Sequence, residues 1–270
     1  MGIVFFLTIG NDLQEAYLTL ATLVLIGLSL AMEKRFPLHT DWNSNKGDTA
    51  GDIGSFVFIF GILDGALKWL SPFLILVLLP NFGLAGNLPL WAQIIAATLL
   101  IEFGAWISHW AHHKYKPLWA LHAMHHSTER LYTLNNFRFH PVNHIINYLI
   151  MFMPLLAFGI SKEAILGYTA LTLPVLLFQH SNIGFNFGIL SHFFNTNTLH
   201  RWHHSSAYKE GMHNFGRALV VWDHLFQTYY NPADADEPNT IGLASSGGTY
   251  PQPNSTLKQI LWPLNKECCR

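Results

Sequence analysis

The sequence predicts an all-α integral membrane protein, in which a helical bundle of about four transmembrane helices carries a cytosolic, histidine-rich helical cap. Three observations support this prediction. Only 11% of the 270 residues are charged and 50% are hydrophobic, whereas soluble domains are about a quarter charged. Several apolar segments are long enough to span a membrane. Fifteen of the 16 histidines lie between His109 and His224.

The composition excludes three other classes of protein. A chain with 14% aromatic residues and few charges buries enough apolar surface to fold, so it is not disordered. The two cysteines, Cys268 and Cys269, are adjacent and terminal, which rules out a disulfide scaffold. A net charge of −1 without a basic stripe argues against a nucleic-acid partner.

The apolar segments define the predicted membrane region. A spanning helix needs about 20 mostly apolar residues. The candidate segments are Ala16–Met32, Ile53–Leu79, Leu88–Ser108 and the two arms of a hairpin, Val142–Ile160 and Ala164–Gln179. The second arm of the hairpin is short for a full crossing, so we expect about four spans.

The segment Ile53–Leu79 is longer than one straight span requires. At 1.5 Å per residue it would measure roughly 40 Å, so we expect a tilted, kinked or two-part helix. It contains Asp64 and Lys68, which are four residues apart and can neutralise each other. We favour a buried helix-packing pair over a functional intramembrane charge.

Basic residues predict the orientation of the bundle. The loop after the first span contains Lys34, Arg35 and Lys46, the next loop contains no basic residue, and four basic residues follow Ser108. Because cytoplasmic loops are rich in lysine and arginine, we expect the N-terminus outside and the histidine-rich stretches and C-terminus in the cytosol. The membrane would be a bacterial inner membrane or the endoplasmic reticulum.

The chain divides into three predicted regions: an N-terminal transmembrane region 1–99, a histidine-rich region 100–230 with the embedded membrane hairpin 142–180, and a C-terminal region 231–270. Residues 231–256 are rich in proline, glycine and serine, which predicts an irregular surface strap. The apolar residues of 257–264 predict a short helix docked at the membrane interface.

Histidines recur at helical spacing in three motifs. The first runs from His109 to His113, and two HxxHH motifs run from His122 to His126 and from His200 to His204. On a helix, positions i, i+3 and i+4 project to one side. Adding His180 at the end of the hairpin gives the candidate metal ligands His109, His113, His122, His125, His126, His180, His200, His203 and His204.

Nine imidazoles are too many for one metal ion, because a single zinc takes three or four protein ligands. Two metals, with open positions for a substrate molecule, fit the number better. We expect the two metals to lie within about 4–6 Å of each other. Imidazole suits Zn, Cu, Fe and Ni alike, so the ligands alone do not identify the metal.

These motifs resemble those of the sterol desaturase / fatty acid hydroxylase superfamily. The shared elements, in order, are His109–His113, His122–Ser127, Arg138–Pro141, His180–Asn182, His200–Ser205, Asn214–Gly216 and Trp222–Thr228. The resemblance implies a membrane di-iron enzyme that uses O2 and electrons to hydroxylate or desaturate a lipid C–H bond. Zinc can replace iron in recombinant protein, because affinity tends to favour zinc over ferrous iron.

Supporting residues are expected around the ligands, since metal-bound imidazoles generally donate their other N–H to a carboxylate or carbonyl. Glu102 lies seven residues before His109 on the same helix face, and Asp223 belongs to the last family motif. Both are candidate orienting carboxylates. Asn182 and His140 are further candidates for this outer layer, and for His140 we favour a structural role over that of a ligand.

The reaction would need a membrane lipid as substrate, O2 and an external electron donor. The donor would be of the cytochrome b5, ferredoxin or flavin-reductase type, because we find no flavin fingerprint, cytochrome-b5-like segment or cysteine cluster in this sequence. Two alternatives stay open. One is a membrane zinc-binding or metal-transport protein, and the other is a bis-histidine haem protein. The sequence leaves the lipid, the donor and the choice between hydroxylation and desaturation undetermined.

Overall fold

A computed structural model of the chain describes residues 1–78, 83–233, 235, 237–243 and 250–265, with only the backbone of 74–78. Within these ranges the protein is helical and contains no β-strand, only three isolated β-bridges. The predicted all-α class is therefore confirmed. Leu79, at the end of one predicted span, and both cysteines lie outside the described residues.

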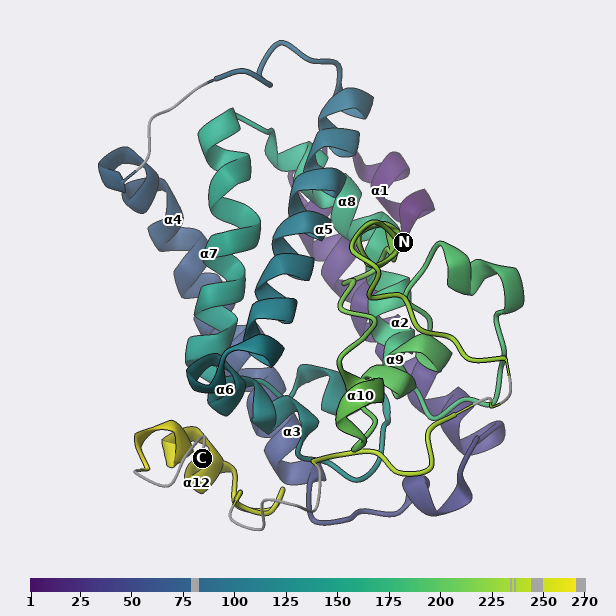
Figure 1. Cartoon of the computed structure of the whole chain (residues 1–270). Coiled ribbons are helices and arrows are strands. Elements are labelled where there is room, and N and C mark those ends of the chain that lie inside the picture. The colour runs from purple at the N-terminus through teal and green to yellow at the C-terminus, as the bar shows by residue number, and fades with distance from the viewer. Residues whose placement is uncertain (79–82, 234, 236, 244–249, 266–270) are drawn as a thin grey trace.

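Long helices form one end of the molecule and short helices form the other (Figure 1). The long ones include α2 (Gln14–Arg35), α5 (Leu90–Lys114), α7 (Pro141–Phe158) and α8 (Lys162–Gln179), and the short α1 (Gly2–Thr8) packs against α2 and α8. Four helical stretches are long and apolar enough to cross a membrane: Gln14–Arg35, Thr49–Phe73, Leu90–Lys114 and Pro141–Phe158. This finding agrees with the predicted four spans.

The second of these stretches is a helix of three parts. It consists of α3 (Thr49–Ser55), the π-helix η2 (Phe56–Leu63) and α4 (Asp64–Leu78). The predicted irregularity is thus a π-helical segment, a feature that often marks functional sites. Asp64 pairs with Lys68 at 2.7 Å, as predicted, but the Lys68 side chain is 68% exposed, so the pair is not the buried one that we expected. The second oxygen of Asp64 lies 3.5 Å from the His144 ring.

Helix α5 is the centre of the bundle and packs against α6 (Lys116–His126), α7 and α8. Gly104 allows this close packing, because a Cβ there would lie only 3.0 Å from the Ile150 carbonyl oxygen of α7. The hairpin of α7 and α8 turns where the sequence predicts. Gly159 ends α7 in the left-handed conformation, with φ of 75°, and the Ser161 hydroxyl accepts a hydrogen bond from the Ala164 N–H to begin α8.

The remaining short elements make up a cap. They are η1 (Thr40–Asn43), α6 (Lys116–His126), η3 (Thr133–Phe137), η4 (Gly188–His192), α9 (Asn197–His203), α10 (Tyr208–Gly211), α11 (Val221–Leu225), α12 (Thr256–Leu261) and η6 (Trp262–Leu264). Of these, α6, α9, α10 and α12 lie toward the lower end of the bundle in Figure 1. Two buried ion pairs, Arg130–Asp48 and Arg138–Asp52, join the cap to the start of the second span. The cap is therefore fixed to the bundle by charge as well as by packing.

Candidate metal centre

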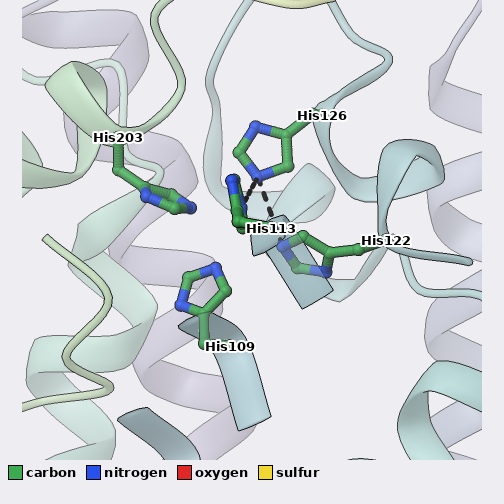
Figure 2. Close-up of side chains that lie close together, drawn as sticks. All are labelled: His109, His113, His122, His126 and His203. Atoms are coloured by element: carbon green, nitrogen blue, oxygen red, sulfur yellow. Dashed lines mark hydrogen bonds between the residues drawn. The ribbon is translucent and has the colours of Figure 1, made fainter. Parts of the chain in front are cut away.

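The nine predicted histidines converge in two groups at the junction of bundle and cap. The first cluster contains His109, His113, His122, His126 and His203, whose rings point toward one centre (Figure 2), and the second contains His125, His180, His200 and His204. Within each cluster the ring nitrogens that face inward lie within 4.8 Å of one another. Every candidate ligand from the sequence is therefore in a position suited to hold a metal ion.

The two HxxHH motifs contribute to both clusters. On α6, His122 and His126 are one turn apart and join the first cluster, while His125 joins the second. The second motif, on α9, does the reverse: His200 and His204 join the second cluster, and His203 joins the first. The His126 and His204 rings stack at a centroid distance of 4.2 Å, so the clusters adjoin.

In each cluster, ring nitrogens that face inward lie close to one another. Nε2 atoms lie 3.2 Å apart between His126 and both His113 and His122, as the dashed lines of Figure 2 show, and 2.9 Å apart between His180 and His200. Where the opposite Nδ1–H donates outward, Nε2 carries only a lone pair. Lone pairs that converge in a buried space fit a shared cation.

Hydrogen bonds behind the rings fix which nitrogen faces inward. Five of the nine histidines place Nδ1 within 2.8–3.2 Å of an oxygen. These pairs are His109 with Phe215 O, His122 with Asn143 Oδ1, His125 with Arg138 O, His180 with Asn135 Oδ1 and His203 with His213 O. The Nε2 atoms of His109 and His203 are buried without a partner among the described residues. This donor set, with its supporting acceptors, fits metal binding.

Burial keeps these imidazoles neutral. It lowers the pKa of His125 to about 3, with the approach of a second histidine, His109, as the next cause. Burial and the approach of other histidines lower the pKa of His126 and of His204 well below the ordinary range. A neutral imidazole has the lone pair that a metal needs, so the folded site is ready to bind metal at neutral pH.

The family model for fatty acid hydroxylases matches residues 94–228, which is half of the chain. The match includes all nine clustered histidines. The chain belongs to the fatty acid hydroxylase family. It is therefore a metal-dependent oxidoreductase of the lipid hydroxylase type, and its apolar helices make it an integral membrane protein.

Three relatives are named as a lipid hydroxylase or as alkylglycerol monooxygenases. Ornithine lipid hydroxylase OlsE of Rhizobium tropici is 28% identical over 95% of this chain and 78% of its own length. Alkylglycerol monooxygenase of Homo sapiens is 29% identical over 50% of this chain, and that of Caenorhabditis elegans is 26% identical over 56%. The match covers only 30% and 29% of these two longer proteins. No solved structure matches the chain significantly.

The two carboxylates predicted to orient imidazoles, Glu102 and Asp223, instead bind the backbone of a loop that contacts one of the histidines. Glu102 accepts hydrogen bonds from the backbone N–H groups of Ala218 and Leu219, each at 2.9 Å. Asp223 accepts from the N–H groups of Phe215 and Gly216, each at 2.8 Å. Among the described residues, neither carboxylate forms a hydrogen bond with an imidazole. Both instead hold the loop 215–219, whose Phe215 carbonyl accepts the His109 hydrogen bond.

The other two predicted supporting residues also lie outside the clusters. Nδ1 of His140 accepts a hydrogen bond from the Val142 N–H at the start of α7. Its Nε2–H donates to the Ile260 carbonyl of α12. Both bonds join backbone segments, which is the structural role that we favoured for His140. Asn182 bonds the backbone of His39 through both ends of its amide. Asn182 therefore supports the loop at His39, and its amide forms no hydrogen bond with a clustered histidine among the described residues.

A side chain that we did not predict does contact a ligand ring. Asn143 of α7 is fully buried, and its Oδ1 accepts from His122 Nδ1–H at 2.9 Å. Its amide N–H donates to His112 Nε2 at 3.0 Å, because His112 Nδ1–H is committed to the Ser108 carbonyl at 2.7 Å. This chain of bonds fixes the orientation of His122. An asparagine in an apolar span was the available signal.

Proposed function

We propose that this protein hydroxylates a C–H bond of a membrane lipid, using O2, an external electron donor and two iron ions held by the nine clustered histidines. The observation that carries the proposal is the pair of adjoining, buried clusters whose inward nitrogens have no protein partner or face one another. Family membership supports the lipid and the hydroxylation.

Iron is the metal that suits the reaction. An unactivated lipid C–H bond requires a redox-active metal that can activate O2, and zinc is redox-inert. The protein's own contribution is geometric. Outward hydrogen bonds such as that from His203 Nδ1 to the His213 carbonyl hold the rings in place, and burial at the bundle end excludes water from them.

The names of the relatives suggest two kinds of substrate for this chain. One is an aminoacyl lipid such as ornithine lipid, and the other is an alkylglycerol. In our proposal the lipid enters sideways from the bilayer and its polar end lies at the cap. The cap lies on the cytosolic side, where basic loop residues are concentrated, and a soluble reductase supplies the electrons.

The test is the fate of oxygen in lipids of cells that express the protein. We expect a lipid species heavier by one oxygen atom under ¹⁶O2, and heavier by a further two mass units under ¹⁸O2. His203→Ala, made at the same expression level, should lack this species. A new product with no isotope label would contradict the proposal, and so would an unchanged lipid profile in cells whose protein contains two irons.

A further inference from the structure

A polar pocket lies in the cap beside the second histidine cluster. Its volume is about 520 Å³, within the usual range for small-molecule sites. One wall is the loop after α2, with His39, Asp41 and Trp42, and the opposite wall is the strap from Glu237 to Leu243. None of the nine clustered histidines lines it.

Hydrogen bonds hold the pocket walls in place. The strap is anchored where Gly242 N–H donates to the His204 carbonyl and Ser206 N–H donates to the Thr240 carbonyl, each at 3.0 Å. The His39 ring joins the two walls through a 2.9 Å contact with the Glu237 carboxylate. Because His204 belongs to the second cluster, the pocket adjoins the candidate metal centre through a direct backbone bond.

The pocket also lies at the level expected for lipid head groups. The membrane-spanning α2 ends at Arg35, and the loop that contributes His39 and Trp42 follows within a few residues. The Trp42 ring lies 4.3 Å from the His39 ring. Tryptophan is typical of the membrane–water interface, so Trp42 just after a candidate span fits a wall that faces lipid head groups.

The charges that line the pocket are of both signs. Arg201 of α9 contributes a guanidinium whose side chain is only 6% exposed, and its Nε lies 4.0 Å from the Glu237 carboxylate. Asp41, Glu129 and Glu237 provide three carboxylates. A guanidinium binds a carboxylate through two parallel hydrogen bonds. Carboxylates and the face of Trp42 attract an ammonium group.

We propose that this pocket binds the polar head of a lipid that carries both a carboxylate and an ammonium group, as an aminoacyl lipid does. The inference rests on the proposed function and selects between its two substrate classes. Arg201 would bind the carboxylate, and Glu237 with Glu129 would bind the ammonium. A neutral glycerol head carries no charged group for Arg201, Glu237 or Glu129 to bind, so this lining favours the charged head over the neutral one.

The test measures lipid binding to the full-length protein without O2, so that no turnover occurs. The probes are a synthetic N-acylornithine, its methyl ester, its N-acetylated form and an alkylglycerol of equal chain length, followed by native mass spectrometry in detergent. We expect N-acylornithine to bind at least about tenfold more tightly than each of the others, since a hydrogen bond to a charged group contributes about 1.5–3 kcal/mol.

Charge-neutral variants separate recognition from a loss of structure. Glu237→Gln should weaken N-acylornithine about tenfold while leaving its N-acetylated form unaffected, and Arg201→Gln should remove the preference over the methyl ester. Glu163→Gln, an exposed acid of α8 outside the pocket, is the matched control and should change nothing. Equal metal content in all variants shows that the fold is intact.

The outcomes distinguish this inference from the proposed function. Equal binding of all four probes, or equal effects of Glu237→Gln and Glu163→Gln, overturns the pocket assignment even if ¹⁸O enters lipid. Selective binding that Glu237→Gln removes supports the assignment even if no ¹⁸O enters lipid, and in that case the proposed function is what fails.

Discussion

Replacing Asn143 by leucine tests whether the hydrogen bonds behind the rings control metal binding. Leucine has nearly the shape of asparagine but neither donates nor accepts. The change removes the 2.9 Å bond from His122 and the 3.0 Å bond to His112, so that two buried ring nitrogens lose their partners. Asn143 is 0% exposed, so water does not replace the amide without rearrangement.

The magnitude follows from this count of bonds. An unsatisfied buried polar group costs about 1–3 kcal/mol, so the variant should lose roughly 2–6 kcal/mol of folding stability. Removing an outer partner of a metal-bound histidine typically lowers metal affinity by about 10–100-fold. His122 belongs to the first cluster alone. The affinity of the second cluster should therefore stay close to that of the wild type.

The assay is a metal titration of the full-length protein, with the number of bound ions measured at limiting free metal. The variant should retain one ion per chain where the wild type retains two. Asn147→Leu is the control one turn along α7, because its amide oxygen accepts a 2.7 Å bond from the Ser108 hydroxyl and contacts no histidine. Loss of both ions in Asn143→Leu, or of neither, would refute the reasoning.

Three further predictions concern the ligands, the pH and the buried ion pairs. His125→Ala should abolish lipid hydroxylation while the exposed His192→Ala leaves it largely intact, and equal losses would contradict the site. Burial lowers the pKa of His125 to about 3, against about 6.5 in an unfolded chain. The contribution of this residue to the free energy of unfolding of the metal-free protein should be constant above pH 6.5. It should fall by about 1.4 kcal/mol per pH unit as the pH drops toward 3. Thermal melts whose midpoint does not change between pH 7 and pH 5 would contradict this prediction. Asp52→Asn leaves the fully buried Arg138 guanidinium without its carboxylate. This change should lower the free energy of unfolding by about 3–5 kcal/mol in a denaturant titration. A loss under about 1 kcal/mol would show that the pair is dispensable.

The convergence of the candidate ligands could be predicted because helix geometry acts at short range. The spacing of His122, His125 and His126 places three imidazoles on one side of a helix, whatever packs against it. How the motif divides between two clusters could not be predicted, because it depends on where α9 lies relative to α6. The packing of these two helices is decided by contacts between segments far apart in the chain.

The supporting groups were harder to predict for a different reason. Phe215, His213 and Arg138 bind ligand rings through their backbone carbonyls, and a carbonyl leaves no trace in residue type. Glu102 and Asp223 were recognised as important carboxylates, but they bind backbone N–H groups in a loop. The sequence therefore predicted that these two acids support the site, but it did not predict that they bind backbone N–H groups instead of imidazoles.

The nature of the second span shows the same limit. Its length predicted an irregular helix, and the structure has a π-helix at Phe56–Leu63. The shift from one hydrogen-bonding pattern to another is small in energy and has no simple residue signature. The Asp64–Lys68 pair, by contrast, is set by a spacing of four residues within one helix, and the structure confirms it.

The most direct test of the account is X-ray absorption spectroscopy at the iron edge of gently purified, iron-loaded wild-type protein, together with its iron content. The account predicts two irons per chain, a first shell in which imidazole nitrogen predominates, and an iron–iron distance within about 4–6 Å. A folded protein that holds a single iron, or irons bound mainly by carboxylate oxygen, would contradict it.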